Sequence, residues 1–269
     1  YSFLDDAYKN FDDKKESLAA GMKKAAAEIF ARCNLIVSYT ADDKGYELMS
    51  GLIKELIDKL SAEQLPVATR ALTLKKTRLA LKTSGQVNFV CRVGDYDKAG
   101  IEYNGAMRIL ANMMNSDYLW NNVRVKGGAY GCGAAFGSYS SSLGAFSSYR
   151  DPNLEKTNEI YDKAPEYVES FNADEREMTK YVIGTISDLD LPKTPSVKGS
   201  DSFEAYISGL TEQMLQKERD EVLGATVEDI RALSGMVKAV LDDGYFCVVG
   251  NEDKINEAKD MFDVIEPLA

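Results

Sequence analysis

The chain has 269 residues, of which 45% are hydrophobic, and its 43 acidic and 32 basic residues give a formal net charge of −11. This size predicts one large or two modest globular domains, and no apolar run reaches the roughly 18 residues of a membrane span. The negative charge argues against a nucleic-acid partner, and either favours a cationic partner or serves only solubility.

The sequence contains no histidine. It therefore cannot supply Ser-His-Asp or Cys-His catalysis, nor a hydrolytic zinc site built on histidine.

The cysteines Cys33, Cys91, Cys132 and Cys247 are widely spaced and form no Cys-x-x-Cys pair. We therefore expect reduced, mostly buried thiols in the cytoplasm or another reducing compartment, and no metal site in this chain. The sequence opens at Tyr1 without a methionine, so it does not report on any upstream targeting segment.

Apolar spacing predicts helices and strands along the chain. Leu18, Met22, Ala25 and Ile29 share one face of a helical wheel, whereas Leu35 opens a short apolar run typical of a strand. In chain order the pattern predicts a helix over 12–32, a strand over 35–39, a capping turn at 40–43, a helix over 45–60, strands over 78–82 and 86–93, a helix from 100 to about 124, strands over 129–140 and 143–150, helices over 154–171, 174–189, 200–223 and 226–241, a strand over 245–249 and a closing helix over 252–262.

The end of the chain repeats the pattern of its beginning. Helix, short apolar strand, acidic turn and helix occur over 12–60 and again over 226–262. Aligning Leu35 with Tyr245 brings the acidic turns and the helices that follow them into register as well. The shared order favours an internal duplication over a chance match.

A duplication sets the domain boundaries that we expect. Residues 1–63 would form the C-terminal part of a preceding α/β unit, 64–77 a connection, and 78–269 a complete C-terminal unit. On this interpretation the chain is a portion of a longer polypeptide.

The most informative segment carries an arginine and a tyrosine on either side of a glycine pair. Arg124 follows apolar helix-forming sequence, Gly127 and Gly128 come next, and Tyr130 stands among small residues. Arginine offers five donors and tyrosine one on a stiff ring, so the two could aim at the same carbonyl or carboxylate oxygens. The alternative is a surface arginine at a helix end and a tyrosine that opens a half-buried strand. The glycine pair favours the binding interpretation, because a loop that permits close backbone approach needs a reason.

Other patterns have simpler explanations. The glycines of 131–137 have the wrong spacing for a dinucleotide loop and enter a strand, so they fit small residues in a tightly packed or cleft-lining strand. Acidic pairs such as Asp242–Asp243 stand at predicted helix ends, where capping is favoured over metal binding. Trp120, the single tryptophan, is expected to be a packing anchor rather than a ligand platform.

Residues 118–131 closely resemble the substrate-gripping motif in the far half of the pitrilysin/insulinase family of zinc peptidases, and most closely its presequence-protease branch. Three further segments agree in order, namely 86–90, 148–154 and 183–186. The resemblance extends over 78–269, and the opening segment fits the end of the preceding family repeat.

The resemblance implies an α+β fold, with an antiparallel sheet and helices packed on it. In that family four such units form the two halves of a closing chamber, and the first unit holds zinc on a His-x-x-Glu-His helix. The last unit supplies an arginine and a tyrosine that reach the bound peptide. At matching positions these are Arg124 and Tyr130, with Gly127 and Gly128 shaping the substrate-binding loop.

The implied function is the C-terminal substrate-binding portion of a zinc-dependent oligopeptidase that encloses and degrades unfolded peptides. Zinc would then lie in the N-terminal half of the parent polypeptide, or on a catalytic partner subunit, and this chain alone would not be catalytic. Some relatives have lost zinc, so the alternative is a non-catalytic peptide-binding or scaffold subunit of the same family.

Overall fold

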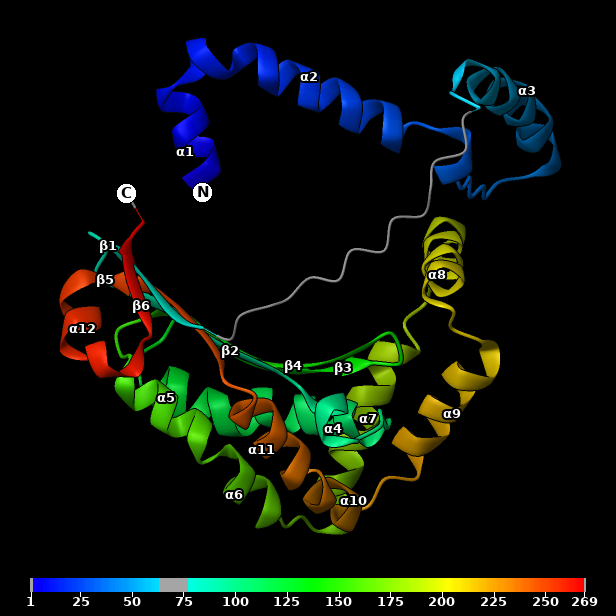
Figure 1. Ribbon diagram of the computed structural model, residues 1–269. Coiled ribbons are helices and arrows are strands. Elements are labelled where there is room, and N and C mark those ends of the chain that lie inside the picture. Colours follow the sequence, from blue (N-terminus) through cyan, green and yellow to red (C-terminus); the bar gives the residue numbers. More distant parts are fainter. Residues whose placement is uncertain (1, 63–76, 269) are drawn as a thin grey trace. The chain divides into compact units, whose positions relative to one another are not determined.

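The computed structural model describes residues 2–62 and 77–268 (Figure 1). Contacts between residues divide the chain into two compact units. One comprises Tyr1–Thr73 with Lys193–Phe203, and the other comprises Leu74–Pro192 with Glu204–Ala269. The connection that we expect over 64–77 lies outside the described residues except for Thr77.

The first unit is helical. It contains α1 (Ser2–Lys9), α2 (Phe11–Ile29), α3 (Asp43–Lys59) and the first part of α8 (Pro195–Ser208), and the predicted helices over 12–32 and 45–60 are confirmed. The predicted capping turn is also present, because the Asp42 side chain accepts a hydrogen bond from the Gly45 backbone N–H at 2.8 Å. Local sequence chemistry therefore determines where α3 begins.

The strand predicted over 35–39 is wrong. These residues form neither a helix nor a β-ladder within the described part of the chain. Ile36 and Val37 are 54% and 46% exposed, so their apolar side chains find no sheet to cover. A strand requires a neighbour to satisfy its backbone, and apolar alternation alone cannot provide one.

The second unit is built on a six-stranded sheet with the order β3-β4-β2-β5-β1-β6. The strands are β1 (Arg78–Thr83), β2 (Asn88–Asp95), β3 (Gly131–Ser138), β4 (Ser141–Asp151), β5 (Tyr245–Asn251) and β6 (Val264–Pro267). The predicted α+β class is confirmed. The sheet is nevertheless mixed rather than wholly antiparallel, because β1 pairs in parallel with both β5 and β6. The long helical connections allow those parallel pairs, whereas β3 and β4 form a tight antiparallel hairpin.

Helices cover one face of this sheet, and Figure 1 shows α4, α5, α6 and α11 beneath it. The predicted helix over 154–171 is divided in two at Lys163, and the one over 200–223 is divided near Gly209. The remaining helices are α4 (Ala106–Met113), α5 (Glu155–Asp162), α6 (Ala164–Glu169), α7 (Glu175–Leu189), α8 (Pro195–Ser208), α9 (Glu212–Leu223), α10 (Val227–Ala232), α11 (Ser234–Asp242) and α12 (Glu252–Glu257). Among the described residues no helix is both long and apolar enough to cross a membrane.

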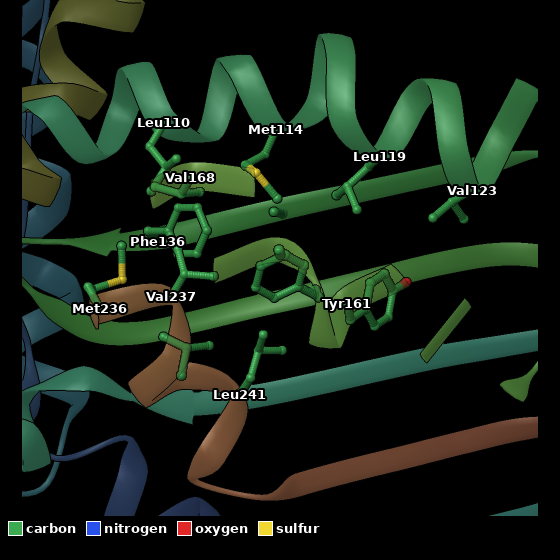
Figure 2. Packing of buried hydrophobic residues seen from close by; sticks show 14 of the residues in the cluster. Leu110, Met114, Leu119, Val123, Phe136, Tyr161, Val168, Met236, Val237 and Leu241 are labelled. Carbon is green, nitrogen blue, oxygen red and sulfur yellow. The ribbon is translucent and has the colours of Figure 1, made fainter. Parts of the chain in front are cut away.

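The core lies between these helices and the sheet. Leu110, Met114, Leu119 and Val123 point from one continuous helical segment toward the strands, where they meet aromatic side chains such as Phe136 (Figure 2). The segment begins at α4, later than the predicted start at residue 100, and continues through two π-helical stretches, Met114–Tyr118 and Trp120–Val125. The extra residue per turn keeps Leu119 and Val123 on the buried side, where an uninterrupted α-helix would rotate them away.

Two further expectations need correction. Cys33 is exposed and Cys91, Cys132 and Cys247 are only half-buried, so the expectation of mostly buried thiols is wrong. The chain also does not end on the closing helix. The short strand β6 follows that helix and pairs with β1 at the edge of the sheet.

Candidate functional site

The end of the π-helical stretch determines where Arg124 lies. The Lys126 backbone N–H donates to the Asn121 carbonyl at 3.1 Å, a bond that spans five residues. Val123 is fully buried by this register, so the next residue, Arg124, emerges at the rim of the core. Extra-residue turns of this kind frequently accompany functional sites, because they re-aim a side chain without ending the helix.

Trp120 supports the Arg124 guanidinium. The guanidinium carbon lies 3.9 Å from the centre of the indole ring, as expected for a cation–π contact between residues one turn apart. Trp120 is 43% exposed, so the prediction that it is a packing anchor is wrong. Its ring is a platform that holds the cation at the surface.

The glycine pair turns the chain from the helix into β3. A Cβ atom at Gly127 would lie 2.4 Å from the Val123 carbonyl oxygen, so no side chain fits there. Gly128 has φ +82°, in the left-handed region that glycine enters at little cost. Its N–H donates to the Arg124 carbonyl at 2.8 Å, and the Ala129 N–H donates to the Val123 carbonyl at 3.2 Å. These two bonds close the helix end within a few residues.

Tyr130 follows immediately and stands at the start of β3. Its backbone N–H donates to the Tyr149 carbonyl on β4 at 3.1 Å, which fixes the position of its Cα. Its ring meets the Tyr149 ring edge to face, with centroids 5.9 Å apart. The side chain is still 69% exposed, so its hydroxyl is available to a ligand.

Arg124 and Tyr130 border one open surface hollow of about 580 Å³. Within the described part of the chain, neither side chain has a hydrogen bond or ion pair with another residue. Gly128 also borders the hollow, whereas Gly127 acts beneath it as the point where the backbone passes the helix end. The lining residues are Trp120, Arg124, Val125, Gly128, Ala129, Tyr130 and Arg150.

Arg150 is a lining residue that the sequence analysis did not single out, although it lies within the 148–154 segment of the family resemblance. Its guanidinium carbon lies 5.9 Å from the centre of the Tyr149 ring. The hollow therefore presents two guanidinium groups and no carboxylate. The charge of Arg124 also reaches β3, where burial raises the pKa of the Cys132 thiol and Arg124 opposes that rise.

Comparison with known proteins decides the family. The PreP C-terminal domain profile matches residues 78–251. The chain belongs to the PreP C-terminal domain family. This confirms the resemblance to the C-terminal portion of presequence-protease relatives in the pitrilysin family.

The relatives of this PreP C-terminal domain are much longer proteins. The chain is 41% identical over 269 residues to Protein HypA of Clostridium perfringens, which covers 100% of this chain and 27% of that protein. It is 31% identical to Presequence protease 1, chloroplastic/mitochondrial, of Arabidopsis thaliana, covering 99% of this chain and 25% of that protein. The chain thus spans about a quarter of the length of these relatives.

A solved structure supports the same fold. The peptidase M16 inactive domain from Pseudomonas fluorescens aligns with a TM-score of 0.52 over 77% of this chain and 51% of that one, at 14% sequence identity. At this identity the likeness concerns the fold alone. The chain thus shares its architecture with a peptidase-family domain that is itself described as inactive.

The described residues of this PreP C-terminal domain do not fit a zinc ion. The sequence has no histidine, and among the described residues no group of three or more cysteine, aspartate or glutamate side chains could hold a metal. Cys91 and Cys247 lie opposite each other on β2 and β5, and burial raises the pKa of both thiols. Both therefore favour the protonated form rather than the thiolate that metals bind. The donors of the hollow are suited to binding oxygens, not to coordinating a cation.

Proposed function

We propose that this chain is the C-terminal substrate-binding portion of a zinc-dependent oligopeptidase that encloses and degrades unfolded peptides. The observation that carries the proposal is the open hollow in which Arg124 and Tyr130 stand side by side without an acceptor from the described part of the chain. The family membership supports it, because the relatives include proteins named presequence proteases.

In this proposal Arg124 and Tyr130 hydrogen-bond carbonyl oxygens of the peptide near the bond that is cut. Trp120 supports the guanidinium of Arg124 and the Tyr149 ring supports the Tyr130 ring before substrate arrives. Fixed donors of this kind orient the peptide and stabilise negative charge that develops on a carbonyl oxygen. Gly127 and Gly128 let the backbone pass close enough for both donors to reach one peptide.

The groups that carry out hydrolysis would belong to polypeptide outside this chain, either an N-terminal half or a catalytic partner subunit. Residues 1–63 would then be the end of a preceding unit, 64–77 a connection, and 78–269 the complete C-terminal unit. A reducing compartment is consistent with the free thiols of Cys91, Cys132 and Cys247.

The test uses the full-length protein. We expect Arg124→Ala and Tyr130→Phe each to lower kcat about 10²–10³-fold, because each removes one donor to a developing oxyanion. The metal content of the purified variants should stay at the wild-type level. Matched controls are Arg176→Ala on α7 and Tyr206→Phe on α8, which change exposed residues outside the hollow and should leave kcat unchanged.

Near-wild-type turnover in both hollow variants would refute these roles. If the full-length protein binds unfolded peptides but never hydrolyses them, the chain instead serves as a peptide-binding or scaffold subunit.

A further inference from the structure

The hollow contains a second cation with no evident structural function. Arg150 borders the hollow with Arg124, and within the described residues its side chain makes no hydrogen bond or ion pair, only the distant contact with the Tyr149 ring. Most other arginines of the same unit form ion pairs, namely Arg78, Arg92, Arg108, Arg219 and Arg231. Arg92, for example, binds Asp162 and donates to the Leu241 carbonyl at 2.8 Å.

The backbone at Arg150 is strained in a way that the fold maintains. Its φ of 49° makes it the only non-glycine residue with positive φ among the described residues. For a residue with a long side chain this conformation costs roughly 1–2 kcal/mol. Strain of this kind persists only where the surroundings enforce it, and it is concentrated at ligand-binding sites.

The residue after Arg150 enforces that conformation. Asp151 is fully buried, and its carboxylate accepts from the Thr157 hydroxyl at 2.7 Å and from the Asn153 backbone N–H at 2.8 Å. Asn153 in turn donates to the Gly127 carbonyl at 2.6 Å, which ties this loop to the glycine pair. Arg150 is thus held at the hollow by the same framework that holds Arg124 and Tyr130.

Two unpaired guanidinium groups at one hollow repel each other unless an anion lies between or beside them. The chain as a whole carries a net charge of −11, so a local pair of free cations stands out against an acidic background. A guanidinium presents parallel N–H groups that match the two oxygens of a carboxylate, and such charge-assisted bonds are stronger than neutral ones.

We propose that Arg150 is a specificity-determining residue that binds a carboxylate of the peptide held by Arg124 and Tyr130. The carboxylate is either the C-terminal carboxylate of the peptide or an acidic side chain, and the positive charge of Arg124 adds to the attraction. This inference rests on the proposed function and refines it by naming a chemical feature of the preferred substrate.

The test measures kcat and KM of the full-length protein on matched peptides. One pair differs only in a C-terminal carboxylate or carboxamide, and another pair differs only in an internal glutamate or glutamine. Wild type should prefer one carboxylate-bearing peptide about tenfold in kcat/KM, mainly through KM, as expected for one charge-assisted hydrogen-bonded contact. The pair that shows the preference identifies the source of the carboxylate.

Three variants connect that preference to Arg150. Arg150→Gln removes the charge and should reduce the ratio to about twofold or less, while Arg150→Lys should retain part of it. Arg150→Gly also removes the charge, and glycine adopts positive φ without strain, so this variant should fold normally and show the same reduced ratio. Arg176→Gln makes the same chemical change on the exposed face of α7 and should keep the wild-type ratio.

Equal kcat/KM for all peptides in wild type, or a wild-type ratio in Arg150→Gln and Arg150→Gly, would overturn the inference. If Arg124→Ala and Tyr130→Phe still lower kcat in that case, the proposed function stands and only the carboxylate role fails. If those two variants also turn over normally, the proposed function fails as well.

Discussion

Two arginine–tyrosine pairs of the second unit differ in whether the fold supplies an acceptor for them. Arg108 and Tyr103 converge on the same oxygen of Glu218, with the Arg108 Nε at 2.7 Å and the Tyr103 hydroxyl in a very short hydrogen bond. Glu218 is only 4% exposed. Burial, together with the bond to Glu218, raises the pKa of Tyr103 above its ordinary value, so the hydroxyl stays protonated and continues to donate.

Arg124 and Tyr130 carry the same donors but meet no carboxylate in the described part of the chain. Their charge and hydroxyl face a hollow instead of a buried oxygen. Residue type therefore does not distinguish a structural arginine–tyrosine pair from one that binds a ligand. What distinguishes them is whether the fold supplies the acceptor, and the first pair shows that this donor combination binds a carboxylate oxygen well.

The largest effect is expected at the Arg108–Tyr103 pair, which shares the buried acceptor Glu218. Glu218→Ala should lower the free energy of unfolding by about 3 kcal/mol, because it leaves Arg108 and the Tyr103 hydroxyl without their shared acceptor. Urea denaturation of the full-length protein measures this, with Glu159→Ala on the exposed face of α5 as a control expected to change stability by no more than about 0.5 kcal/mol.

Below its melting temperature the Glu218→Ala variant should retain wild-type kcat. A selective loss of kcat without loss of stability would mean that the two pairs do not differ as described, and that Arg108 and Tyr103 also act on the substrate.

An intermediate effect is expected at the glycine turn between Arg124 and Tyr130. Gly127→Ala forces a Cβ against the Val123 carbonyl oxygen, so it should cost about 1–3 kcal/mol and lower kcat by displacing Tyr130. Gly235→Ala is the matched control, because nothing lies within 4 Å of the added Cβ in α11 and alanine favours the helix by about 0.5–1 kcal/mol. Equal stability and equal kcat in the two variants would show that the close approach at Gly127 has no role.

The smallest effect is expected at the platform under the cation. Trp120→Leu removes the aromatic face beneath Arg124 and should lower kcat/KM about threefold, the size of an exposed cation–π contact. Trp120→Phe keeps a ring and should lose less. Wild-type kcat/KM in Trp120→Leu would show that Arg124 needs no aromatic support.

The sequence predicts features that depend on neighbouring residues. The cap at Asp42, the apolar stripe over 106–114 and the short antiparallel hairpin of β3 and β4 all follow from local chemistry or periodicity. Arg124 and Tyr130 border the same hollow, as their short separation and the flexible glycine pair between them predict.

Features that depend on distant partners could not be predicted in this way. Residues 35–39 have the composition of a strand but no neighbouring strand among the described residues, and β6 forms only because β1 offers an edge. The π-helical register inserts one residue into a turn, which no regular apolar period signals. Arg150 reaches the hollow through strained backbone held by Asp151, and neither the strain nor the hydrogen bonds can be seen in the sequence.

A structure of the full-length protein with a bound, non-hydrolysable peptide tests the central claim most directly. We expect peptide carbonyl oxygens at hydrogen-bonding distance, roughly 3 Å, from the Arg124 guanidinium and the Tyr130 hydroxyl. A peptide bound elsewhere, with both side chains still facing solvent alone, would contradict it.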